Sequence, residues 1–197
     1  MKQFSNRYIF LYSAGLVAVV AVVLSLVSIS LKPRQERNQR VEQKQMILKT
    51  IGIACTAADA EETYSQHIVE HTDGELPYYQ YQDGIIIPMH GRGLWGPIWG
   101  YMALDGDGTV TGAVFDHKGE TPGLGGEIST DKFAARFVGK SMKERPIRLK
   151  KNADKTSAYE VDAISGGTMT SNGVTAMLDS TYKLYFDLLT GNHYEEQ

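Results

Sequence analysis

The chain has 197 residues, of which 42% are hydrophobic, and it carries a formal net charge of -3. This length suits one folded domain with a sizeable core plus an extension, and the mild acidity gives no electrostatic footprint for a nucleic-acid partner. Cys55 is the single cysteine, which excludes an intrachain disulfide, a CxxC redox pair, a cysteine-ligated cluster and a haem-attachment motif. Any electron transfer by this chain therefore requires a bound cofactor.

An uncharged run, residues 8–31, lies between Arg7 and Lys32. As a helix its 24 residues would span about 36 Å, against about 30 Å of bilayer hydrocarbon. The run is too long for the apolar region of a signal peptide, and no small-residue cleavage site follows it. We therefore expect a short tail over residues 1–7 and then a permanent single-pass anchor in membrane lipid.

Basic residues flank this anchor on both sides, with Lys2 and Arg7 before it and five more between residues 32 and 44. That bias alone places the C-terminal side in the cytoplasm, but long domains often cross a membrane regardless of it. From residue 33 onward the net charge is -6, which suits a face turned away from anionic lipid. The charge pattern leaves the orientation open.

Residues 32–75 are polar and helix-prone, and we interpret them as a helical stalk followed by the first helices of the domain. A break is expected near Pro33, because proline interrupts the helical hydrogen bonds. The next helix is predicted to begin at Thr56 or Asp59 and to end near Glu70.

His67 and His71 would lie one turn apart on that helix, a spacing that can bind a metal ion. No third ligand follows at a useful distance, so exposed histidines are expected and no metal site is predicted.

The pattern changes to short strands and turns after residue 76. Residues 98–104 and 109–115 predict a hairpin around the Asp-Gly-Asp-Gly turn at 105–108, since a calcium loop would need a glutamate where Asp116 stands. Further expected elements are strands at 78–81, 85–87, 146–149 and 157–164, a turn at Asp83-Gly84, a short helix at 129–138 with Phe133, Phe137 and Val138 in the core, and a last helix at 171–189 stopped by Gly191. This order predicts an α+β fold with a single N-terminal transmembrane helix, a largely antiparallel sheet and flanking helices.

Two glycine-rich segments, 89–100 and 116–127, are costly to order, so close packing or a ligand must justify them. Neither has the Lys-Ser/Thr pair of a nucleoside-triphosphate loop. The second segment is either an ordinary connection or a loop whose backbone N–H groups face the polar edge of an aromatic ligand, with Leu124 on a ring face. Acid–base chemistry by His117 and Glu120 is disfavoured, because no nucleophile or third partner accompanies them. A hydrolase is disfavoured because no GxSxG elbow occurs and Cys55 has no motif around it.

Residues 162–174 run from the end of a strand through a small-residue turn into the last helix. Two glycines precede Thr168, and hydroxyl groups at Ser165, Thr168, Thr170 and Ser171 crowd the start of the helix. The first N–H groups of a helix are unpaired and the helix dipole is positive there, so a phosphate is expected over the amides of residues 169–172.

The same residues resemble the flavinylation motif of proteins that carry FMN on a threonine through a phosphoester bond. That motif is roughly Asp, two variable residues, Ser or Thr, Gly, Ala and Thr. Here Asp162, Ser165, Gly166 and Thr168 match it, and Gly167 stands where alanine is usual. The resemblance makes Thr168 the acceptor of the flavin.

Three segments together, 90–100, 120–126 and 165–173, resemble the NqrC family, a subunit family of the Na⁺-translocating NADH:quinone oxidoreductases. The second and third segments also occur in the sister subunit, RnfG, of the Rnf complex. The run Leu-Trp-Gly-Pro-Ile-Trp at 94–99 favours the quinone-reducing complex.

This resemblance implies an electron-relay subunit of a translocase that passes electrons from NADH towards quinone while the complex pumps sodium. It implies an FMN-binding domain over 76–190 with a tail at 191–197, on the periplasmic side of a bacterial inner membrane, and a separate flavin transferase that attaches FMN. Other subunits of the complex would be its partners and would move the sodium, since one uncharged helix forms no ion path. The implied FMN-binding residues are Thr168 as the covalent acceptor, with Asp162, Ser165, Gly166, Gly167, Met169 and Thr170 around it, and Glu120, Thr121, Gly123, Leu124 and Gly125 beside the isoalloxazine ring; no residue of this chain is expected to act as a catalyst.

Two alternatives remain at the level of the sequence. One is the Rnf-type subunit, which uses the same flavin chemistry between ferredoxin and NAD. The other is a membrane-tethered adaptor without a cofactor, whose glycine loops only contact partners.

Overall fold

The computed structural model describes residues 5–82 and 84–190. Lys2, Asp83, Gly191 and the tail at 191–197 lie outside the described residues, so the turn and the helix stop expected there stay predictions. The chain divides into two compact units, one ending at Glu42 and one beginning at Gln43.

Helix α1 (Asn6–Thr50) fills the described part of the first unit and ends in the second. It passes through Pro33 as one helix, so the break expected there is absent. A proline removes one N–H donor from the ladder, and here the helix tolerates that loss. By length and composition α1 can cross a membrane, and its apolar side chains between residues 8 and 31 are exposed within the chain.

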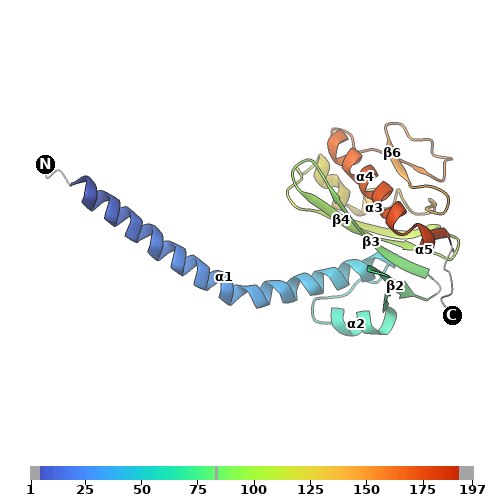
Figure 1. Cartoon of the computed structure of the whole chain (residues 1–197). Coiled ribbons are helices and arrows are strands. Elements are labelled where there is room, and N and C mark those ends of the chain that lie inside the picture. The colour runs from blue at the N-terminus through green and yellow to red at the C-terminus, as the bar shows by residue number, and fades with distance from the viewer. Residues whose placement is uncertain (1–4, 83, 191–197) are drawn as a thin grey trace. The chain divides into compact units, whose positions relative to one another are not determined.

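The second unit is built on a five-stranded sheet in which every neighbouring pair is antiparallel and the spatial order follows the sequence (Figure 1). This confirms the predicted α+β class with a largely antiparallel sheet. The strands are β1 (Val69–Asp73), β2 (Leu76–Tyr81), β3 (Gly84–Arg92), β4 (Pro97–Leu104) and β5 (Val110–His117).

Both faces of the sheet are covered, because successive side chains along a strand point to opposite faces. On one face Ile86 shares a buried cluster with Ile47 and Leu48 from the end of α1. On the other face Ile87 belongs to a larger core that includes Met177 of α4. The last turns of the N-terminal helix are therefore part of the core of the domain.

Helix α2 contributes Tyr64 to the smaller cluster, whereas the other remaining elements surround the larger core, where α4 crosses β3 (Figure 1). Short strands β6 and β7 form a separate parallel pair. The bounds are α2 (Ala60–His67), η1 (Gly125–Ser129), α3 (Asp131–Ala134), β6 (Arg148–Lys150), β7 (Glu160–Asp162), α4 (Thr168–Leu184) and α5 (Phe186–Thr190).

Several expected boundaries are wrong. Helix α2 stops at His67, and His71 lies on the edge strand β1 with its ring stacked 5.2 Å from that of Tyr78, so the two histidines do not share a helix face. Helix α3 is only four residues long, and Val138 beyond it is 53% exposed instead of lying in the core. Phe133 and Phe137 are fully buried as predicted.

Gly112 on β5 marks a close approach between the sheet and the end of α1. A Cβ atom at this position would overlap the carbonyl oxygen of Thr50. We expect Gly112→Ala to lower the free energy of unfolding by about 1–3 kcal/mol, because overpacking forces the helix end away from the sheet. Chemical denaturation followed by circular dichroism measures this. Gly106→Ala is the matched control, since no atom lies within 4 Å of its added Cβ, and equal losses in the two variants would contradict the explanation.

Candidate functional site

Thr168 is the first residue of α4 and follows a turn that leaves β7. Gly166 adopts a positive φ of 75°, a conformation that a side chain would strain, and the N–H of Gly167 donates to the carbonyl of Ile164 at 3.1 Å. Thr168 is exposed, and its hydroxyl group makes no hydrogen bond within the described part of the chain. The turn thus presents an unused hydroxyl at a helix N-terminus.

The other hydroxyl groups of this stretch have different roles. Ser171 Oγ accepts the N–H of Ile164 at 3.0 Å, and Thr170 Oγ1 donates to Glu120 Oε2 at 2.5 Å, so both fasten the turn to the domain. Ser165 is exposed, like Thr168.

The available amides lie slightly earlier than predicted. The N–H of Ser171 already donates to the carbonyl of Gly167 at 2.9 Å, because α4 begins at Thr168 and not near Ser171. The unpaired amides at the helix start are therefore those of residues 168–170, rather than those of residues 169–172.

Glu120 is a buried carboxylate, 4% exposed, and it joins three distant segments. Oε1 accepts the N–H of Trp95 at 2.8 Å, Oε2 accepts the hydroxyl of Thr170, and the backbone N–H of Glu120 donates to His117 Nδ1 at 3.2 Å. Burial by itself raises the pKa of Glu120, but the hydrogen bonds from Thr170 and from the amides of Trp95 and Gly96 outweigh it and lower the pKa below its ordinary value. Its neighbour His117 donates no hydrogen bond to this carboxylate, and the sequence-level idea of an acid–base pair gains no support.

The segment 93–96 is a tight turn between β3 and β4, closed by the N–H of Gly93 donating to the carbonyl of Gly96 at 2.8 Å. The glycine-rich segment 89–100 is thus mostly a hairpin and not a loop. At its tip Leu94 is 51% exposed and Trp95 is 70% exposed. Leu94 and Trp95 are not among the site residues predicted from the sequence, although two large apolar residues between glycines are a signal for a binding surface.

A cleft of about 320 Å³ lies beside the hydroxyl of Thr168, and we call it the apolar cleft. Eight large hydrophobic residues of the second unit are exposed among the described residues, and four of them line this one cleft. Exposed apolar groups gathered in one hollow indicate a ligand or a partner. The lining residues are Leu94, Trp95, Glu120, Thr121, Leu124, Gly125, Gly166, Gly167, Thr168, Met169 and Thr170.

A second cleft of about 550 Å³ lines the same turn, and its members include Lys151, Asp162, Ser165 and Thr168. Asp162 is exposed, and its Oδ1 accepts the N–H of Ala153 at 3.0 Å. The carboxylate of Asp162 thus fastens the loop before β7 and forms no hydrogen bond to the Thr168 hydroxyl.

Eleven of the twelve residues predicted for the site line the two clefts, and nine of them line the apolar cleft. Gly123 lines neither cleft, and its positive φ of 74° gives it a turn-forming role. A Cβ at Gly125 would overlap Glu120 and Thr170, so that glycine permits their contact. Within the described residues no cluster of three or more potential metal ligands occurs.

Comparisons with known proteins point to one family. A model of the FMN-binding domain family matches residues 93–183. The chain is similar to the crystal structure of NqrC, a subunit of the Na(+)-translocating NADH-quinone reductase, from Parabacteroides distasonis, with 33% identity and a TM-score of 0.74 over 81% of this chain and 97% of that one.

Further relatives extend the comparison. The NqrC protein of Vibrio vulnificus is 26% identical over 84% of this chain and 86% of its own length. That of Pseudomonas aeruginosa is 40% identical over a shorter region, 59% of this chain and 46% of the relative. Shewanella oneidensis NqrC shares the fold at a TM-score of 0.65 with 19% identity.

Proposed function

Because the chain belongs to the NqrC family of Na⁺-translocating NADH-quinone reductase subunits, we propose that it carries FMN covalently on Thr168 and relays electrons from NADH towards quinone. The family makes it an electron-transfer subunit with an FMN-binding domain. When bound, FMN supplies the one- and two-electron chemistry that no side chain of this protein can provide.

The observation that carries the proposal is the position of Thr168, an exposed hydroxyl at a helix N-terminus beside an apolar cleft. The amides of residues 168–170 are unpaired and point out of the helix start, so they can hold the phosphate that joins FMN to the protein. The Thr168 side chain thus offers the attachment point, and the unpaired backbone N–H groups offer partial positive charge for the phosphate.

The apolar cleft fits the ring of the same cofactor. Its volume of about 320 Å³ lies within the range of small-molecule sites, and Leu124 and Trp95 offer flat or branched apolar surface at its rim. Thr121 can hydrogen-bond a polar ring edge from the same side. These residues would hold the ring while leaving one edge open to an electron partner.

Attachment calls for a separate flavin transferase. A threonine hydroxyl is a poor nucleophile without a base, and no base is hydrogen-bonded to Thr168 in the described part of the chain. In the transfer Thr168 Oγ bonds to the FMN phosphorus of FAD, the diphosphate P–O bond breaks, AMP leaves with the electron pair, and the transferase takes the hydroxyl proton.

Helix α1 supports a single-pass position in the inner membrane. We place the domain on the outer, periplasmic face, in contact with the other subunits of the complex. Those subunits would move sodium, because the membrane-spanning part of α1 has no charged residue between Arg7 and Lys32.

Intact mass spectrometry of the chain co-expressed with a flavin transferase tests the proposal. We expect a gain of one FMN less one water, together with flavin fluorescence of the denatured band. If the transferase modifies another acceptor but leaves this chain unchanged, the protein is an adaptor without a cofactor and the proposal fails.

A further inference from the structure

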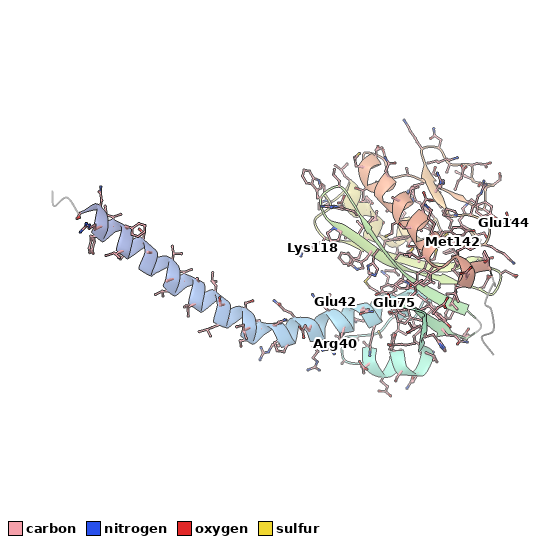
Figure 2. The ribbon with its side chains drawn as sticks, in the orientation of Figure 1. Arg40, Glu42, Glu75, Lys118, Met142 and Glu144 are labelled. Atoms are coloured by element: carbon pink, nitrogen blue, oxygen red, sulfur yellow. The ribbon has the colours of Figure 1, made fainter. Side chains whose placement is uncertain are left out.

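The stretch 132–155 concentrates positive charge in an otherwise acidic protein. It contains nine of the chain's 20 lysine and arginine residues and only two acidic residues, Glu144 and Asp154. The stretch therefore has a net charge of +7, against -10 for the rest of the chain. Figure 2 shows Glu144 on the side of the domain opposite to Lys118, which comes from the end of β5.

Most of this charge is not neutralised within the protein. Three of the nine cations reach a carboxylate, through the pairs Lys143–Asp107, Arg148–Asp179 and Lys150–Glu160. The other six have no ion pair in the described part of the chain. Arg136 and Lys140 donate to backbone carbonyls instead, at 2.7 Å to Asp162 and 2.6 Å to Ser157.

The carboxylates of the two acidic residues in the stretch accept hydrogen bonds from other groups. Glu144 Oε2 accepts the hydroxyl of Tyr159 at 3.1 Å, and Asp154 Oδ1 accepts both the N–H and the hydroxyl of Thr156. Both carboxylates are thus held by groups close to them in the fold.

The unpaired cations lie next to the acceptor threonine. Lys151 lines the 550 Å³ cleft that also contains Thr168. Arg136, Lys140 and Lys155 line a smaller hollow together with Glu160, which is paired with Lys150, and with Asp162, which this hollow shares with that cleft. Any protein that reaches Thr168 from this side must cover these side chains.

We infer that the basic stretch 132–155 is the surface on which the flavin-transferring enzyme docks, through an acidic face of that enzyme. The inference rests on the proposed attachment of FMN to Thr168. A patch of one sign that is left unpaired raises the rate of encounter with a partner of opposite charge and orients it. Here it would guide the enzyme onto the turn that presents Thr168.

The experiment measures the initial rate of flavin incorporation into the full chain in neutral phosphatidylcholine nanodiscs, at low and at high salt. The variant is Lys151→Glu/Lys155→Glu, whose side chains are exposed and form no ion pair in the described part of the chain. Lys183→Glu is the matched control, an equal type of change at an exposed position 15 residues and about 22 Å further along α4.

We expect the double variant to lower kcat/KM for the acceptor chain about tenfold at low salt, with kcat nearly unchanged and with a weaker salt dependence than the wild type. The control should change less than twofold. Equal kcat/KM and equal salt slopes for wild type, control and double variant would overturn the inference.

Other outcomes overturn it in distinguishable ways. A raised KM for FAD with an unchanged KM for the acceptor would make the stretch a subsite for the dinucleotide itself. A difference seen only in discs containing phosphatidylglycerol would make it a surface for anionic lipid. No incorporation into the wild type would instead refute the proposed function. Equal melting temperatures of the variants confirm that folding is unchanged.

Discussion

Thr168→Ala is expected to carry no covalent flavin after co-expression with the transferase, whereas the wild type is fully or largely modified. The variant lacks the hydroxyl that is proposed to form the phosphoester, and the neighbouring hydroxyls of Thr170 and Ser171 are buried in structural hydrogen bonds. Intact mass spectrometry and in-gel flavin fluorescence both measure the covalently bound flavin.

The turn around Thr168 supplies matched controls. Thr168→Ser keeps a hydroxyl at the same atom and should retain modification at a reduced rate. Ser165→Ala removes an exposed hydroxyl from the same turn and should be modified like the wild type. A flavin found on Ser165, or on Thr168→Ala at wild-type yield, would show that the acceptor is elsewhere.

Glu120→Gln should lower the free energy of unfolding by about 2–3 kcal/mol at neutral pH. The two oxygens of Glu120 accept from Trp95 N–H and from the Thr170 hydroxyl, so an amide would place its NH₂ group against one of these donors. The donor that faces the NH₂ group then loses its acceptor, and the link between the turn at 93–96 and α4 is broken at that point. Chemical denaturation measures the loss, with Glu127→Gln in the same loop as a control that should change stability by less than about 0.5 kcal/mol.

The same carboxylate predicts a pH dependence. Its pKa is lower in the folded protein than in the unfolded chain, so it stabilises the fold above its unfolded pKa of about 4.3, and this contribution is lost as the pH falls through the folded pKa. Between neutral pH and strongly acidic pH the wild type should therefore lose more stability than Glu120→Gln. Parallel stability curves for the two proteins would show that folding does not lower the pKa of Glu120.

Short sequence patterns predicted the parts of the fold that depend on contacts between residues close together in the sequence. The Asp-Gly-Asp-Gly turn fixed the hairpin of β4 and β5, where Asp105 Oδ1 accepts the N–H groups of Asp107 and Thr109. The last helix was predicted at 171–189, and α4 in this region buries Val174, Met177 and Leu178 in the core.

Tertiary contacts determine the features of the fold and of the site that could not be predicted from the sequence. Strand β1 is a polar edge strand that has no hydrophobic alternation, so the helix before it was extended too far. The glycines at 93 and 96 suggested a loop, yet they permit close packing on Glu120 and on the carbonyl of Lys118. The hydrogen bond between Glu120 and Thr170 joins residues 50 positions apart, and no sequence pattern predicts it.

The burial of Ile47 and Leu48 in the domain core also determines where the protein can be separated from its anchor. A protease that cuts between residues 34 and 42 would release a domain that keeps these two side chains under its sheet. A cut only a few residues later, beyond Leu48, would strip one face of the sheet and leave apolar surface that favours aggregation. Release of an intact domain from the anchor is therefore confined to the short stretch of α1 that precedes Ile47.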